Sequence, residues 1–305
     1  MRGSVVSGGE TVHFEMRIVD ARSRAQRASD TQRGRPAGNV LILVPGHGQT
    51  VDGPRNLLAA AAQLSRSGVA CCVDPVPARG GDRTEAEAIA TIARAAIDYL
   101  FPRPQGLVPI QATAIGWSHG GGEALRAAGR HPDLFPQYLG LCPTGLVERH
   151  PVELVCSFFL EALRILSTSF VRGNWRCVAI TLRLGANALV GLVKDLARSR
   201  SLKRVVADVR WAGRKVPGPA FGYTGEVVIL CAESDRVVRW RDAFPGCDCS
   251  QGVESSLPAY GQDNFPLAGR VEVLVLPGDH VSPEVDPTSF LRAGLRPLGQ
   301  LSEPQ

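Results

Sequence analysis

Short apolar runs alternate with longer amphipathic stretches along most of this chain. Between the runs, residues 52–67 and 84–100 carry apolar side chains at helical spacing, in segments of about 15 residues. Strands that alternate with helices of this length predict a mostly parallel sheet, with helices on both faces and right-handed crossovers. The runs that predict buried strands are 40–44, 69–73, 112–115, 138–142, 226–231 and 271–276.

Three stretches depart from this rhythm. Residues 11–19 alternate apolar and polar side chains and predict an edge strand, whereas 21–38 are polar and predict an exposed loop or linker. Residues 151–211 contain no strand signal, and their apolar spacing predicts two or more helices, the last around Leu202, Val206 and Val209. We therefore expect an α/β core made of 1–145 and 221–305, with a helical insertion at 146–220.

Composition narrows the class of protein. Hydrophobic residues make up 44% of the 305 positions, enough for a large core, and the net charge is a mild +5. No basic run is interleaved with aromatic residues, so we expect no nucleic-acid partner. We find no signal-peptide pattern at the N-terminus and no run of about 20 uncharged apolar residues. These observations predict a cytoplasmic protein with no stable membrane insertion.

The cysteines indicate neither disulfides nor a metal site. Most of the eight lie within apolar runs, where a thiol behaves as a small hydrophobic group. Cys71 and Cys72 fall in a predicted strand and should face opposite sides of the sheet. Cys247 and Cys249 have ligand-like spacing, but no second Cys or His pair stands nearby to complete a zinc site. We expect free thiols and no bound metal.

The most distinctive motif is Gly116-Trp117-Ser118-His119-Gly120, which joins a predicted strand to a predicted helix. A tight turn of this kind holds the apex serine in a strained conformation, and small neighbours are needed because a Cβ would collide with the backbone. The pattern alone is loose in a chain with 33 glycines, and a glycine-rich loop with a solvated serine is the alternative. We interpret Ser118 as a nucleophile.

A serine nucleophile needs a base and a group that orients the base. His280 follows the last predicted strand, and Asp235 follows the one before it, with Glu233 as an alternative acid. Because ligands of such sheets bind beyond the carboxyl ends of the strands, all these residues should meet at one edge. The predicted catalytic residues are Ser118, Asp235 and His280.

In order and in context, these residues resemble the α/β-hydrolase superfamily of serine hydrolases, and the likeness extends over nearly the whole chain. The resemblance implies the α/β-hydrolase fold, a helical cap at 146–220 and no cofactor. It also implies an oxyanion hole made by the backbone N–H groups of His119 and Gln49, with His47 bracing the loop. The matching segments are 45–49, 116–121, 233–238 and 278–280.

The expected reaction is cleavage of a small, fairly apolar carboxylic ester or thioester through an acyl-Ser118 intermediate. Phe158, Phe159, Leu163 and Phe170 would favour an apolar substrate if they line the inner face of the cap; otherwise they form the core of the cap. Fold alone does not choose the chemistry, so acyl transfer, C–C hydrolysis and cofactor-free haloperoxidase chemistry are alternatives. A non-catalytic binding protein on the same scaffold is a further alternative.

Overall fold

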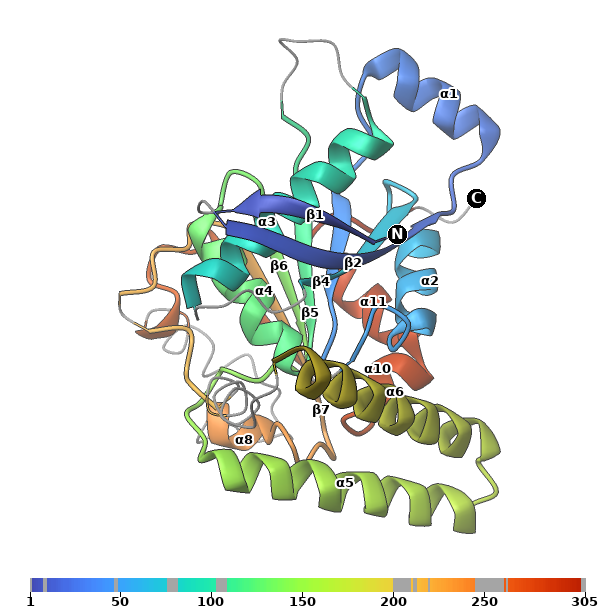
Figure 1. The fold of residues 1–305 in the computed structure, drawn as a ribbon, viewed down its shortest axis with the longest axis vertical. Helices are drawn as coiled ribbons and strands as arrows, with labels where there is room; N and C mark the ends of the chain where they lie inside the picture. The colour runs from blue at the N-terminus through green and yellow to red at the C-terminus, as the bar shows by residue number, and fades with distance from the viewer. Residues whose placement is uncertain are drawn as a thin grey trace.

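Eight strands form one sheet in the part of the chain that the structure describes (Figure 1). This computed structural model describes residues 2–7, 10–46, 49–75, 82–102, 109–199, 210, 213–218, 220–244, 261 and 263–302. The strands are β1 (Arg2–Ser7), β2 (Glu10–Asp20), β3 (Val40–Val44), β4 (Val69–Pro75), β5 (Ala112–Trp117), β6 (Gln137–Leu141), β7 (Glu226–Ala232) and β8 (Arg270–Leu276). The helices are α1 (Arg24–Arg33), α2 (Arg55–Leu64), α3 (Asp82–Leu100), α4 (His119–Arg130), α5 (Pro151–Val171), α6 (Trp175–Ser199), α8 (Trp240–Ala243), α10 (Ser282–Val285) and α11 (Pro287–Leu295).

Six of these strands are parallel and confirm the fold class expected from the sequence. The sheet order is β1-β2-β4-β3-β5-β6-β7-β8, and every pair from β4 to β8 is parallel. At the other edge β2 runs antiparallel to β4, and β1 extends the sheet by pairing with β2. Strand β5 therefore lies near the middle of the sheet, where the turn that follows it is flanked by the ends of β3 and β6.

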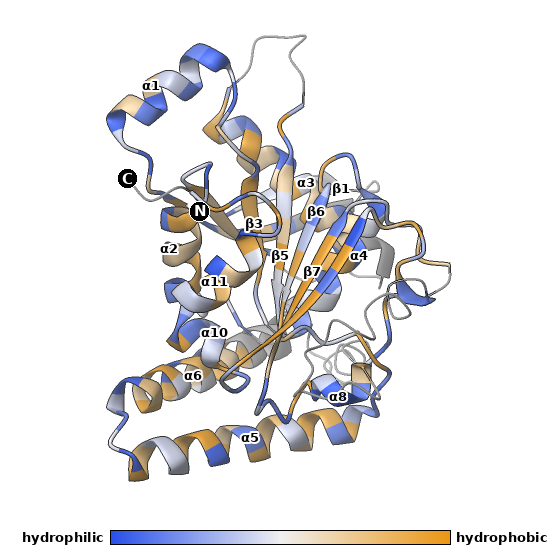
Figure 2. Cartoon of the chain, turned by 180° about the vertical axis from the view of Figure 1, so that it is seen from behind, coloured by the Kyte–Doolittle hydropathy of each residue, from blue (hydrophilic) through white to orange (hydrophobic). Residues whose placement is uncertain are grey.

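Helices cover both faces of the sheet, as Figure 2 shows by hydropathy. Alternate residues of β3 supply the two cores: Val40, Ile42 and Val44 pack with α3 and α4, whereas Leu41 and Leu43 pack with α2 and α11. Cys71 and Cys72 divide between the same two cores, as the strand period requires. The fully apolar runs are thus strands buried on both sides.

The predicted loop at 21–38 is wrong, because α1 forms there. Ser23 caps the helix by accepting from the backbone N–H of Gln26, and Gly34 ends it with a φ of 66°. The helix is polar all round, so no apolar periodicity marks it in the sequence. Buried ionic contacts hold it instead: the guanidinium of Arg22 binds both Asp20 and Asp30.

Helices α5 and α6 form a hairpin that lies across the carboxyl ends of the parallel strands (Figure 1). The division into a core and a cap at 146–220 stays a prediction, and the expected helix around Leu202–Val209 lies outside the described residues. By length and composition alone, α5 could cross a membrane. Glu153, Glu161 and Arg164 interrupt its apolar residues, so α5 contains no uncharged run of about 20 residues.

Candidate active site

Ser118 sits at the apex of a strained turn between β5 and α4. Its backbone has φ 55° and ψ −125°, in a region that side-chain-bearing residues rarely adopt. The Ser118 N–H donates to the carbonyl of Leu141 at 3.0 Å, and its own carbonyl accepts from the N–H groups of Gly121 and Thr144, both at 2.9 Å. These bonds to β6 and the loop after it fix the hydroxyl above the end of the sheet.

The glycines around Ser118 are required by close backbone approach. A Cβ on Gly120 would lie 2.2 Å from the carbonyl oxygen of Pro45. A Cβ on Gly116 would lie 2.4 Å from the carbonyl oxygen of Gly120. Both contacts are with backbone, which cannot swing away as a side chain could, so the expectation of small residues on both sides of the serine is confirmed.

The imidazole of His280 lies between Ser118 and Asp235. Its Nε2 is 2.9 Å from the Ser118 Oγ, and its Nδ1 is 2.8 Å from Oδ2 of Asp235. The loop that carries His280 is held from the elbow itself, since the indole N–H of Trp117 donates to the His280 backbone carbonyl at 3.3 Å. No pattern in the sequence points to this hydrogen bond.

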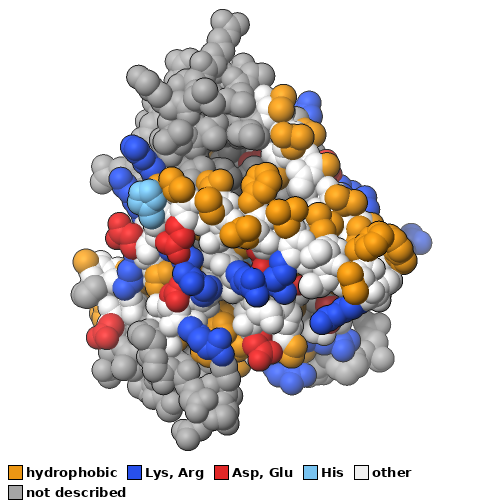
Figure 3. Space-filling view, turned by 90° about the horizontal axis from the view of Figure 1, so that it is seen from below, with side chains coloured by type: hydrophobic (Ala, Val, Ile, Leu, Met, Phe, Trp, Pro, Cys, Tyr) orange, Lys and Arg blue, Asp and Glu red, His pale blue; other side chains and the backbone are white. Residues whose placement is uncertain are grey.

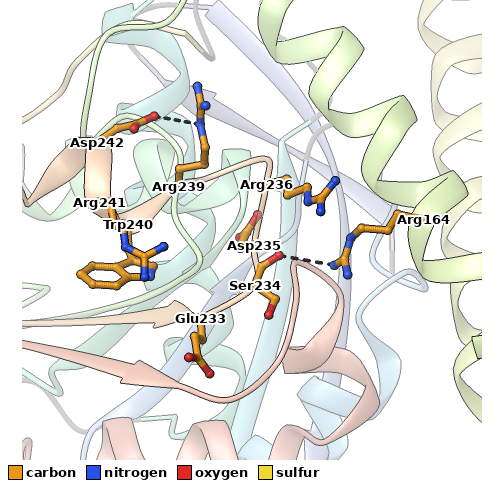
Figure 4. A pocket seen from close by; sticks show the side chains of 9 residues that line it. All are labelled: Arg164, Glu233, Ser234, Asp235, Arg236, Arg239, Trp240, Arg241 and Asp242. Carbon is orange, nitrogen blue, oxygen red and sulfur yellow. Dashed lines mark hydrogen bonds and ion pairs between the residues drawn. The ribbon is translucent and has the colours of Figure 1, made fainter. Parts of the chain in front are cut away.

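Asp235, and not Glu233, faces the histidine. Oδ1 of Asp235 accepts from the backbone N–H groups of Val237 at 2.7 Å and Val238 at 2.9 Å, which leaves Oδ2 for His280. The Glu233 side chain is exposed and lines a cavity to which Asp235 also contributes (Figure 4), and the carboxylate hydrogen-bonded to His280 is that of Asp235. The carboxylate is thus held in one orientation by its own turn.

Cys142 is a further contact of Asp235 that the sequence did not indicate. Its thiol lies beside the buried Asp235 carboxylate. Its backbone φ is 45°, and among the described non-glycine residues only Ser118 shares a positive φ. Burial, and then the charge of Asp235, raise the pKa of the thiol well above its ordinary value. The Cys142 side chain is therefore a neutral thiol at neutral pH.

Two opposing effects set the pKa of His280. Burial alone would lower it, because a buried imidazolium loses its hydration. The charge and hydrogen bond of Asp235 raise it, and the nearby carboxylates of Glu161 and Asp279 raise it further. The acidic groups prevail, so the pKa lies above its ordinary value of 6.5. The ring is consequently a stronger base than a free histidine.

Helix α5 lies over the site, and the three side chains are buried. Ser118, Asp235 and His280 are only 3%, 4% and 5% exposed. Phe158 of α5 meets the imidazole edge-on, with ring centroids 5.1 Å apart. The sequence assigns four apolar residues either to the inner face of the cap or to its core. Of these, Phe158 alone contacts the site, and Phe159, Leu163 and Phe170 are exposed on the outside of the hairpin.

Arg164 ties α5 to the loops of the site. Its guanidinium binds both carboxylate oxygens of Glu161 at 2.7 Å, and it donates to the backbone carbonyl of Ser234 at 3.3 Å (Figure 4). It also approaches the carboxylate of Asp279 at 4.0 Å. Arg164 and Ser234 line two neighbouring cavities, of about 520 and 330 Å³, and Ser118 lines neither.

The predicted oxyanion donors are the backbone N–H groups of His119 and Gln49. His119 is the first residue of α4 and follows Ser118 directly. The N–H of Gln49 donates to the carbonyl of Gly46 at 3.0 Å, which closes a tight turn, and its side chain donates to the Leu184 carbonyl. The assignment of Gln49 as an oxyanion donor, like that of His119, stays a prediction. His47 lies outside the described residues.

The six described cysteines are free, in line with the sequence, while Cys247 and Cys249 lie outside the described residues. Cys156 alone among those six is exposed.

Comparisons with known proteins identify similar structures only. No model of a protein family matches the sequence, and no curated protein matches it. A meta-cleavage product hydrolase from Pseudomonas fluorescens is 14% identical, with a TM-score of 0.59 and 97% of each chain covered. A thermophilic esterase from Thermogutta terrifontis is 13% identical, with a TM-score of 0.57 and coverage of 98% of this chain and 99% of that one. An enol-lactonase from Burkholderia xenovorans is 11% identical, with a TM-score of 0.56 and coverage of 98% and 100%. At these identities the likeness concerns the fold.

Proposed function

Because the chain has the α/β-hydrolase fold, we propose that it is a serine hydrolase that cleaves a small, fairly apolar carboxylic ester or thioester. The proposal rests on one observation above all. A single imidazole lies 2.9 Å from the Ser118 hydroxyl through Nε2 and 2.8 Å from the Asp235 carboxylate through Nδ1. A base within hydrogen-bond distance, oriented by a carboxylate, is what a serine needs to become a nucleophile near neutral pH.

In the first half-reaction the Ser118 Oγ attacks the substrate carbonyl while His280 Nε2 accepts the hydroxyl proton. Asp235 stabilises the resulting imidazolium through Nδ1. The N–H of His119, at the start of α4, would donate to the developing oxyanion. His280 then returns the proton to the departing alcohol or thiol, which leaves an acyl group on Ser118.

In the second half-reaction water replaces the leaving group. His280 takes a proton from the water as its oxygen attacks the acyl carbon, and a second tetrahedral intermediate forms. Collapse of that intermediate breaks the bond to Ser118 Oγ, which recovers its proton from His280. The products are the free acid and the original enzyme, so no cofactor enters the balance.

We assign the cap role to the hairpin of α5 and α6. The three reacting side chains are almost fully covered, and Phe158 of α5 lies against His280, so we expect α5 to shift when a substrate binds. Phe158 would then border the acyl or alkyl group, which supports a preference for an apolar substrate.

A fluorophosphonate probe followed by an ester screen tests this function. The probe should label wild-type protein at Ser118, and Ser118→Ala should abolish labelling while the circular dichroism spectrum is unchanged. p-Nitrophenyl esters of graded chain length, beside a thioester panel, then give the substrate class. Folded wild-type protein that stays unlabelled would favour the alternative of a binding protein on this scaffold.

A further inference from the structure

The α5–α6 hairpin turns its apolar stripes away from the protein. Large hydrophobic side chains recur at helical spacing along its outer surface, and each is between 46% and 84% exposed. Figure 3 shows them as a band across this face of the molecule. The stripe residues are Val152, Val155, Phe159, Leu160, Leu163, Phe170 and Val171 on α5, and Trp175, Leu182, Leu189, Val190 and Val193 on α6.

The opposite faces of both helices carry the polar contacts to the core. On α5 these are Glu161 and Arg164, which reach the loop at Ser234. On α6, Asn187 exchanges hydrogen bonds with Thr50. The inner faces also bury apolar residues, Leu154 and Ile165 on α5 and Ile180 and Leu184 on α6. The outer stripe is therefore a second apolar surface, and an exposed apolar surface of this kind indicates a partner of its own.

The charged residues at the end of the apolar stripe indicate the chemistry of that partner. Arg172 and Arg176 flank the turn of the hairpin, and neither forms an ion pair with any residue that the structure describes. Beside them, Phe170 and Trp175 pack edge-to-face, with centroids 5.2 Å apart. Exposed tryptophan and arginine at the end of an apolar stripe are typical of surfaces that rest in a bilayer interface and meet anionic headgroups.

We propose that the outer face of the α5–α6 hairpin binds the surface of anionic lipid bilayers. The helices lie in the interface with the stripe among the upper acyl chains, and Arg172 and Arg176 contact lipid phosphates. Although α5 is long and apolar enough to span a membrane, spanning would carry Glu161 and Arg164 into the hydrocarbon and break the contact with Ser234. The docking is therefore peripheral and reversible, and it does not depend on the reaction at Ser118.

Flotation with lipid vesicles tests the proposal on the full chain. Vesicles of equal phosphatidylcholine and phosphatidylglycerol should carry the protein, and raising the salt should weaken binding. The double variants Phe159→Ser/Leu163→Ser and Arg172→Gln/Arg176→Gln should each lower the partition coefficient roughly tenfold or more. Leu267→Ser, which removes an equally exposed apolar side chain elsewhere, should leave it unchanged.

Two further measurements fix the site and separate it from catalysis. Brominated lipids should quench part of the tryptophan fluorescence, and Trp175→Phe should remove that part. Ser118→Ala should bind vesicles like the wild type, so failure of the proposed chemistry leaves this result intact. The proposal is overturned if the wild type does not float, or if the hairpin variants float as well as it does. It is equally overturned if those variants only convert a soluble dimer into a monomer, since the band would then be a self-association surface.

Discussion

The indole N–H of Trp117 donates to the backbone carbonyl of His280, so the residue before the proposed nucleophile holds the loop of the proposed base. Trp117→Phe keeps most of the packing but leaves that buried carbonyl without its donor. We expect a stability loss of about 1 kcal/mol. We also expect kcat to fall several-fold with KM little changed, because the imidazole of His280 is no longer held at hydrogen-bond distance from the Ser118 hydroxyl. Denaturant unfolding and steady-state ester kinetics measure the two effects. Equal kcat values for the variant and the wild type would show that the loop needs no such support.

The pH dependence of ester cleavage should follow His280. Activity requires the neutral imidazole, and a raised pKa keeps the ring protonated to higher pH. The rising limb of kcat/KM should therefore lie above pH 6.5, the ordinary pKa of histidine. Glu161→Gln removes one of the charges that raise this pKa, so the limb should move to lower pH. The exposed Glu148→Gln is the matched control and should leave the limb in place. A limb that moves upward in Glu161→Gln would contradict this account.

Glycine substitutions should separate close backbone approach from helix propensity. Gly120→Ala would place a Cβ 2.2 Å from the Pro45 carbonyl oxygen, and we expect a protein that is largely insoluble or has a much lower Tm. Gly185→Ala in α6 meets no atom within 4 Å, so it should stabilise the protein by up to about 1 kcal/mol through better helix propensity. Expression in soluble form and thermal melts compare the two. A Gly120→Ala protein as stable as Gly185→Ala would show that the elbow tolerates a side chain.

Alkylation should distinguish the cysteines. Cys156 is exposed, whereas burial raises the pKa of Cys71 to about 12 and raises those of Cys72, Cys142 and Cys231 as well. Iodoacetamide at pH 8 should modify Cys156 in the folded protein and leave these four intact until denaturant is added. Peptide mapping by mass spectrometry reads the result. Rapid labelling of Cys142 without denaturant would mean that the site opens far more often than the burial of Cys142 indicates.

Much of this fold was predictable because its signals are local. Buried parallel strands are continuous apolar runs, so β3, β4, β5 and β7 were located correctly within two residues at each end. Ser118, Asp235 and His280 each follow such a run directly, and sheet topology then brings them to one edge. The sequence alone therefore sufficed to list the three residues that the structure brings together.

The remaining features depend on contacts that no periodicity records. Helix α1 is polar all round and is stabilised by the ion pairs of Arg22. The hydrogen bond from the Gln49 N–H to the Gly46 carbonyl depends on local backbone geometry. An apolar stripe has the same spacing whether it faces inward or outward, so Phe159 and Leu163 were expected inside the hairpin and lie outside it.

The two helices of the hairpin are hydrogen-bonded to two different loops at the carboxyl end of the sheet. Helix α6 is joined to the loop after β3 through Asn187 and Thr50, whereas α5 is joined to the loop after β7 through Arg164 and Ser234. The turn at Gly173 lies between these two attachment points in the sequence. It is exposed, and a Cβ on Gly173 would meet no atom within 4 Å. Proteolytic cleavage at that turn would consequently leave each helix attached to its own loop. The cleaved protein would keep α5 and α6 in place over the site.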